Sequence, residues 1–244
     1  MSTADRKARQ KDFVRRFNAL TGRHSGGELW RDWVQLVACA ISNALPGPHR
    51  DAREKLYMDI AGKYDPGTLQ AFAELNGMLV NSMDESVVEN DYGDFLGELF
   101  MELELGNSLG GQFFTPYNLC AMMARMQASG FAAAIRADGW ATVHDCACGA
   151  GATLIGAAQA MREAGIDYQR DALFVGQDID GCTALMCYIQ LSYLGCPGYV
   201  RIGNSLTDPP TGSVLENPWE AGPDTWFTPM YHADTWMLRL LKAR

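Results

Sequence analysis

The residues best suited to chemistry form a short turn, Asp145–Gly151, with the sequence D-C-A-C-G-A-G. An apolar run over 140–143 precedes the turn, and a helix-forming run over 152–164 follows it. An acid at the carboxyl end of a strand, followed by small residues and a helix, is typical of a nucleotide-binding turn in an α/β sheet. Glycine lets the backbone approach a ligand closely because it has no Cβ atom. A tight strand–helix turn without a ligand is the alternative interpretation.

Two later segments also end apolar runs with polar side chains. Residues 173–178 predict a second strand that ends in Asp178, and residues 199–206 predict a third strand that ends at Asn204. Ligands of open α/β sheets bind where the carboxyl ends of the strands meet. The sequence therefore predicts that the three polar strand ends converge on one crevice.

These segments, together with one upstream motif, resemble a known family when they are taken in order. They read G-Q-F-F-T-P at 111–116, D-x-x-C-G-x-G at 145–151, G-Q-D-I-D at 176–180 and G-N-S-L at 203–206. This order resembles the modification subunit of type I restriction systems and its small phage and mobile-element relatives, over about residues 84–206. The resemblance implies S-adenosylmethionine (SAM) as cofactor and DNA as substrate. It also implies a specificity subunit or a second methyltransferase subunit as partner.

The resemblance assigns roles at the methionine and ribose ends of the cofactor. Asp145 would accept a hydrogen bond from the ammonium group of SAM. Asp178 would accept both ribose hydroxyls, and Asp180 is the competing candidate. The expected cofactor-binding residues are Gln112, Phe114, Thr115, Pro116, Asp145, Ala147, Gly149, Gly151, Asp178, Ile179, Asn204 and Leu206.

The resemblance assigns the remaining residues to the adenine and the methionine carboxylate of the cofactor. Asn204 would meet the amino edge of the adenine, and Ile179 and Leu206 would lie on either side of its ring. The segment 113–116 would close over the methionine carboxylate with backbone amides at a helix N-terminus. Thr115 is the expected cap of that helix, with a proline at its first position.

Methyl transfer to an amino group needs further side chains, which the relatives supply as Asn-Pro-Pro-Tyr/Phe on a fourth strand. There the Asn and a backbone carbonyl accept hydrogen bonds from the target amino group, and the aromatic ring stacks on the flipped base. Asn217, Pro218 and Trp219 are the expected catalytic residues, with Trp219 in place of the second proline. Asp208–Thr211 and 226–229 are further candidates, and an Asn-Pro pair in a loop without a catalytic role is the alternative.

Composition argues against a membrane-spanning, a secreted or a zinc-binding protein. The 244 residues carry a net charge of −9, and no apolar run approaches the ~20 residues of a membrane span. The charged N-terminus lacks the apolar core of a signal peptide, so we expect a cytoplasmic protein. The seven cysteines lack the paired C-x-x-C spacing of a zinc site, so we expect reduced, mostly buried thiols and no metal site.

Charge is distributed unevenly along the chain. Residues 1–31 hold eight Lys or Arg and three acids, a net +5, whereas residues 84–104 hold eight acids and no base. A protein that binds DNA by itself usually has a broad basic face. The basic N-terminal arm predicts contact with phosphate or with an acidic partner, or it is simply a solvated helix face.

Apolar spacing divides the chain into two parts. Helical periodicity, a capping box at Ser25 and Glu28, and an Asp65-Pro66 helix start predict an all-helical N-terminal domain over residues 1–105. Strands and helices then alternate, as in the first half of a doubly wound sheet. We predict an α/β, Rossmann-like SAM methyltransferase domain over residues 106–244 with a truncated sheet. Residues 207–229, rich in Pro, Gly and Trp, predict an irregular segment before a short closing helix.

Three functions follow from these patterns. The first is a SAM-dependent methyltransferase for the exocyclic amino group of adenine in DNA, active alone or only with a partner subunit. The second is a non-catalytic, regulatory SAM-binding module, which the degenerate Asn217–Trp219 favours. The third is a methyltransferase for RNA or protein, which the net acidity favours.

Overall fold

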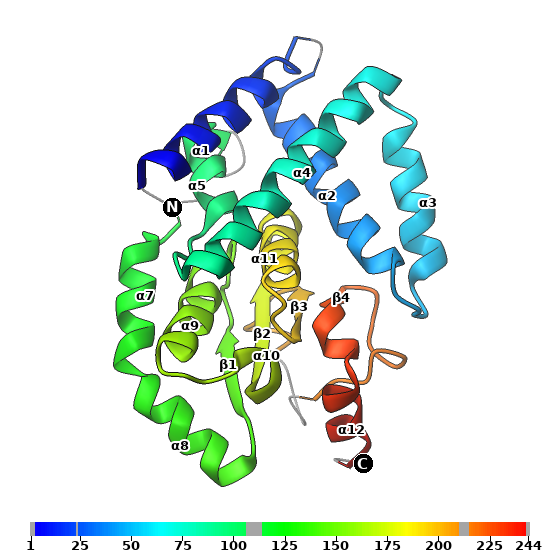
Figure 1. Ribbon diagram of the computed structural model, residues 1–244. Coiled ribbons are helices and arrows are strands. Elements are labelled where there is room, and N and C mark those ends of the chain that lie inside the picture. The colour runs from blue at the N-terminus through cyan, green and yellow to red at the C-terminus, as the bar shows by residue number, and fades with distance from the viewer. Residues whose placement is uncertain (1–2, 23, 106–113, 210–214, 243–244) are drawn as a thin grey trace.

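The computed structural model describes residues 3–22, 24–105, 114–209 and 215–242. It has an α/β architecture in which helices surround a small sheet (Figure 1). The order across the sheet is β1-β2-β3-β4, with the first three strands parallel and the last antiparallel to its neighbour. The strands are β1 (Ala141–Asp145), β2 (Ala172–Asp178), β3 (Gly198–Ile202) and β4 (Thr225–Phe227).

Helices begin where the sequence places capping residues. Ser25 accepts a hydrogen bond from the Glu28 amide at 3.2 Å, and Asp65 accepts one from the Gly67 amide at 2.9 Å, so both predicted helix starts are confirmed. Ahead of the sheet lie α1 (Thr3–Asn18), α2 (Gly26–Asn43), α3 (Arg50–Ala61), α4 (Pro66–Glu89), α5 (Phe95–Glu102), α7 (Tyr117–Met126) and α8 (Ala128–Asp138). After β1 come α9 (Ala152–Glu163), α10 (Tyr168–Asp171), α11 (Gly181–Tyr193), η1 (Pro229–His232) and α12 (Asp234–Lys242).

Both faces of the central strand β2 are buried. Six of the seven residues of β2 are buried, which explains why this strand reads as a continuous apolar run. On one face, Phe174 and Val200 join the large core formed with α9 and α11. On the other face lies a smaller core of Leu173, Val175, Tyr199, Phe227, Tyr231 and Trp236.

The N-terminal helices contact the sheet layer through α11. Trp30 of α2 is fully buried, and its indole N–H lies 3.4 Å from the sulfur of Met186 in α11. The large core continues from α1 through α5 into α9 and α11. The division into domains at residue 105 stays a prediction.

The segment 207–229 differs from its prediction because it contains a strand. Thr225–Phe227 pairs antiparallel with β3, from Arg201↔Thr225 to Tyr199↔Phe227. Three residues are too few to produce a periodic pattern, and the apolar partners that stabilise β4 come from β3 and η1. A single closing helix, α12, follows as predicted.

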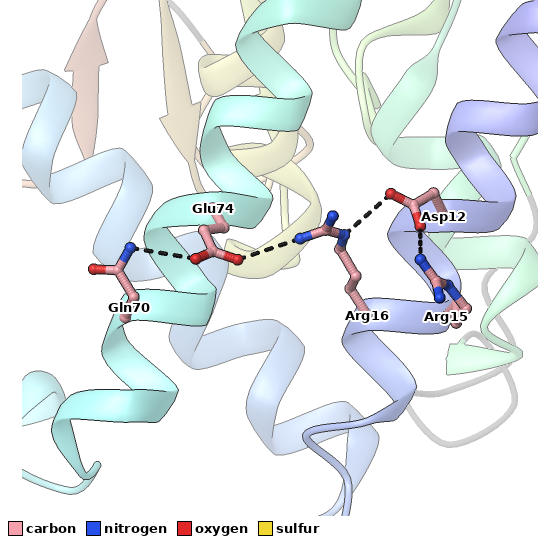
Figure 2. Close-up of polar contacts among 5 residues, drawn as sticks. All are labelled: Asp12, Arg15, Arg16, Gln70 and Glu74. Atoms are coloured by element: carbon pink, nitrogen blue, oxygen red, sulfur yellow. Dashed lines mark hydrogen bonds and ion pairs between the residues drawn. The ribbon is translucent and has the colours of Figure 1, made fainter.

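Three arginines of the basic arm, Arg9, Arg15 and Arg16, form ion pairs within the chain. Arg16 of α1 bonds Asp12 at 3.0 Å and Glu74 of α4 at 3.2 Å (Figure 2). Figure 2 also shows Gln70 on the other oxygen of Glu74 and Arg15 on Asp12, and the two arginines lower the pKa of Asp12. These internal pairs favour a solvated helix face for this part of the arm. In the described ranges, no helix is long and apolar enough to cross a membrane.

Candidate functional site

The turn after β1 depends on glycine at two positions. Gly149 and Gly151 have φ values of +52° and +100°, which side-chain-bearing residues rarely adopt. A Cβ atom on Gly149 would lie 3.1 Å from the ring of Phe114, and one on Gly151 would lie 2.8 Å from the sulfur of Cys187. Each position therefore combines a left-handed backbone with a close neighbour.

Asp145, at the end of β1, braces this turn. Its carboxylate accepts a hydrogen bond from the Ala147 amide at 3.0 Å and another from the hydroxyl of Thr153 in the first turn of α9. The side chain is half-buried. A carboxylate has about four acceptor positions, so Asp145 keeps acceptor capacity for a ligand cation.

Asp178 connects the ends of the three parallel strands. One carboxylate oxygen accepts the amide of Gly149 at 2.8 Å, and the other accepts the amide of Asp180 at 2.9 Å. Its main-chain oxygen accepts the amide of Gly203, which follows β3, at 2.8 Å. The three strand ends therefore meet around Asp178, although Asp178 and Asn204 do not line the cavity over the glycine turn.

A cavity of about 290 Å³ opens over the turn. This volume is near the lower end of small-ligand pockets, which begin at about 300 Å³. Of the two strand-end carboxylates, Asp145 lines the cavity and Asp178 borders it through its bond to the Gly149 amide. The turn and Asp145 fit a ligand with an ammonium group, as in SAM. The lining residues are Asp94, Phe114, Thr115, Cys120, Asp145, Ala147, Cys148, Gly149, Ala150, Ala152 and Thr153.

Asp94 belongs to this cavity although no sequence pattern singled it out. It precedes α5 and accepts the Gly97 amide at 2.8 Å as a helix cap. The same oxygen accepts the side-chain amide of the fully buried Gln190, which also donates to the Ala150 carbonyl at 2.8 Å. This contact joins the start of α5 to the glycine turn, and only the fold brings the three segments together.

A second cavity, of about 380 Å³, lies beside β1. Among the described strands β1 is at the edge of the sheet, and its Thr142 and His144 are exposed. The cavity shares Asp145 and Thr153 with the first one. A group bound beside β1 would therefore lie next to a ligand of the glycine turn.

The segment before α7 differs in detail from its prediction. The helix starts one residue later than expected, because Pro116 is the N-cap and Thr115 forms no side-chain cap. Phe114 is half-buried and packs against Phe100, with ring centroids 5.3 Å apart. Gln112 lies outside the described residues.

The residues expected around the cofactor adenine surround no closed pocket. Ile179 and Leu206 follow β2 and β3 and are 71% and 90% exposed. The side chain of Asn204 accepts the Leu206 amide at 2.9 Å and so caps a turn. The structure brings Asn204 close to Asp178 through the adjacent Gly203.

The expected catalytic residues lie apart from the glycine turn. Asn217, Pro218 and Trp219 precede β4, which is three strands from β1. The Asn217 side chain accepts the Trp219 amide at 3.2 Å, and Trp219 is 59% exposed. Pro218 lines a small pocket formed with the α2–α3 loop and β4. The structure therefore does not bring these three residues to the cavity over the glycine turn.

The seven cysteines are free thiols, five of them buried. Cys146 of the turn is exposed, and burial raises the pKa of Cys182 to about 12. Within the described residues, no group of three or more His, Cys, Asp or Glu side chains could hold a metal ion.

One comparison with known proteins identifies the family. The family model described as N-6 DNA Methylase matches residues 91–222, more than half of the 244 residues. No curated protein and no solved structure matches the chain. The matched range includes Asp94, the glycine turn, Asp178 and the segment before β4. The chain belongs to the N-6 DNA methylase family.

Proposed function

We propose that the chain is a SAM-dependent methyltransferase for the exocyclic amino group of adenine in DNA. Its sheet would be a truncated, Rossmann-like one. The observation that carries the proposal is the glycine turn, where Asp145 and Gly149 line one cavity and Asp178 bonds the Gly149 amide. The family match supports the same assignment.

The chain's own residues would bind and orient the cofactor. The Asp145 carboxylate would accept a hydrogen bond from the ammonium group of SAM, while the Thr153 hydroxyl holds that carboxylate in place. Asp178, already fixed by two backbone amides, would accept the ribose hydroxyls. Ile179 and Leu206, both exposed on neighbouring strand ends, would cover the adenine, and Asn204 would meet its amino edge. Bound SAM would supply an electrophilic methyl group.

The acceptor base would enter beside β1, in the cavity that shares Asp145 and Thr153 with the cofactor cavity. Asn217 and Trp219 remain the proposed amino-group acceptor and stacking residue, and they would have to approach from the far side of the sheet. A partner subunit, either a specificity subunit or a second methyltransferase, would complete the arrangement around DNA.

A non-catalytic SAM-binding module is the second candidate. One observation favours it: the glycine turn follows β1, whereas Asn217–Trp219 precede β4, at the other end of the described strand order. Transfer of tritiated methyl groups from SAM to DNA, RNA and protein tests the choice. Label in DNA adenine supports the methyltransferase, and label in RNA or protein alone would replace DNA as the substrate. SAM binding without transfer, with and without candidate subunits, would support the second candidate.

A further inference from the structure

A small pocket between the α2–α3 loop and β4 collects basic side chains in an acidic protein. Its lining includes two arginines and two histidines and, among the described residues, no carboxylate. The whole chain carries a net charge of −9. The residues that line this arginine pocket are Ser42, Leu45, Pro46, Gly47, Pro48, His49, Arg50, Arg53, Pro218, Thr225, Phe227 and His232.

Arg53 is held rigidly at the pocket wall. Its guanidinium lies 3.9 Å from the centre of the Trp226 ring and donates to the Ser42 hydroxyl at 2.7 Å. It also donates to the main-chain oxygens of Thr225 at 2.9 Å and Pro223 at 3.1 Å. These partners are uncharged carbonyl and hydroxyl oxygens, and Asp224 acts on the guanidinium as a nearby charge without forming an ion pair in the described structure.

Neither Arg50 nor Arg53 forms an ion pair in the described part of the chain, unlike Arg9 and Arg16 of α1. The acids of α3 nearby do not line the pocket, and Glu54 accepts a hydrogen bond from Asn43. Burial lowers the pKa of His232, so this ring is a neutral hydrogen-bonding group at neutral pH. The positive charge of the pocket therefore comes from the two arginines.

A buried tyrosine lies beside Arg53. Tyr188 of α11 is fully buried, and its hydroxyl lies near the hydroxyls of Ser42 and Ser192. Its electrostatic neighbours include Arg53, and its ring packs 5.5 Å from that of Trp226. Tyr188 therefore packs against Trp226, over which the guanidinium of Arg53 lies.

The size and place of the pocket restrict the ligand. Its free space of about 30 Å³ corresponds to about two water molecules, at ~10–15 Å³ for each. This space fits the two non-bridging oxygens of one phosphodiester group and excludes a nucleoside. The pocket also lies at the N-terminus of the 12-residue α3, where the helix dipole favours an anion.

We propose that the arginine pocket binds one phosphodiester group of a nucleic acid strand that passes over Trp219. Pro218 belongs to the pocket, and the next residue, Trp219, is exposed. Three strand spacings of ~4.8 Å separate β4 from β1 by about 14 Å. About four nucleotides of one DNA strand span that distance at 3.4 Å each. The inference rests on the proposed function, because it makes the pocket a contact for the same substrate.

The test measures binding of a short fluorescein-labelled DNA duplex, and of its single strand, by anisotropy at several salt concentrations without SAM. Arg50→Gln removes an exposed charge of the pocket, and Lys55→Gln removes an exposed charge from the same helix outside it. Arg50→Gln should weaken DNA binding about tenfold at ~0.1 M salt. It should also reduce by about one the slope of the logarithm of DNA affinity against the logarithm of salt concentration. Lys55→Gln should change neither.

Arg53→Gln should have the larger effect, and a melting curve shows whether that variant remains folded. The proposal fails if Arg50→Gln and Lys55→Gln behave alike or if the wild type binds no DNA. Inorganic phosphate is also added as a competitor of DNA. If phosphate competes with DNA in the wild type but not in Arg50→Gln, and the two proteins show the same salt dependence of DNA affinity, the pocket binds free phosphate. That result also overturns the proposal. Calorimetry with SAM on the same proteins reports separately on the proposed function.

Discussion

The two parts of the predicted site are built differently. At the glycine turn, the side chains contact distant segments: Asp178 bonds Gly149, and Gln190 bonds Ala150. In the segments after β3 and before β4, the predicted side chains bond neighbours two residues away, as Asn204 bonds Leu206 and Asn217 bonds Trp219. The cofactor end is therefore organised by the fold itself.

This difference indicates which contacts each part still lacks. Leu206 and Trp219 are 90% and 59% exposed, whereas Cys148 and Ala150 of the turn are buried. Large exposed apolar side chains beside a binding site gain stability when a ligand or partner covers them. We therefore expect the glycine turn to bind its ligand in the isolated chain, and the segment before β4 to need nucleic acid or a second subunit.

Gly151→Val should have the largest effect on this comparison. The new side chain would adopt φ near +100° and overlap Cys187, so we expect a loss of about 2–5 kcal/mol in unfolding free energy and loss of SAM binding. Chemical denaturation and SAM titration measure the two effects. Gly165→Val is the control, since Gly165 also has positive φ but no atom near its Cβ position. Equal destabilisation of both variants would contradict the packing argument.

Asp178→Ala should weaken SAM binding about tenfold to a hundredfold. The change removes an acceptor for two hydroxyls, and hydrogen bonds to charged groups contribute about 1.5–3 kcal/mol. Asp180→Ala is the matched control, because Asp180 caps α11 through the Thr183 amide. That variant should lose about 1 kcal/mol of stability and keep its affinity. The opposite pattern would transfer the ribose role to Asp180.

Asn217→Ala and Trp219→Ala should reduce methyl transfer about tenfold each, with SAM affinity near that of the wild type. This pattern is expected when only contacts to the acceptor base are lost, and base stacking contributes about 1–3 kcal/mol. Transfer to plain duplex DNA by the isolated chain should itself be weak or absent. Strong transfer that survives both substitutions would move the catalytic role to Asp208–Thr211 or to 226–229.

Asp208→Ala should have the smallest effect. Its ion pair with Arg201 is at the surface, with the Asp208 side chain 61% exposed, and such pairs contribute about 0–1 kcal/mol. Gln177→Ala, which removes the buried amide that donates to the Asp208 carbonyl at 3.0 Å, should destabilise more. Thermal melting compares the two. A larger loss in Asp208→Ala would mean that the ion pair holds the segment after β3.

Local patterns predicted the elements that depend on local forces. Ser25 and Asp65 cap helices through amides two or three residues away, and β2 is apolar because both of its faces are buried. The sequence did not predict β4, since its stability comes from pairing with β3. It also missed Asp94, which lines the cavity over the glycine turn and is bonded by Gln190, almost a hundred residues later in the chain.

Within the site, the sequence predicted the turn and the convergence of strand ends but not the position of Asn217. The order of strands depends on tertiary contacts, here between β3, β4 and the C-terminal helices. A motif's place along the chain therefore says little about which edge of the sheet it occupies.

Calorimetric titration of the isolated chain with SAM tests the central claim most directly, because the glycine turn is already organised without a ligand. We expect saturable binding at one site with micromolar affinity, about −7 to −8 kcal/mol. S-adenosylhomocysteine, which keeps the ammonium group and the ribose, should bind in the same range. Absence of heat and of any melting shift with both ligands would contradict the assignment of the glycine turn as a cofactor site.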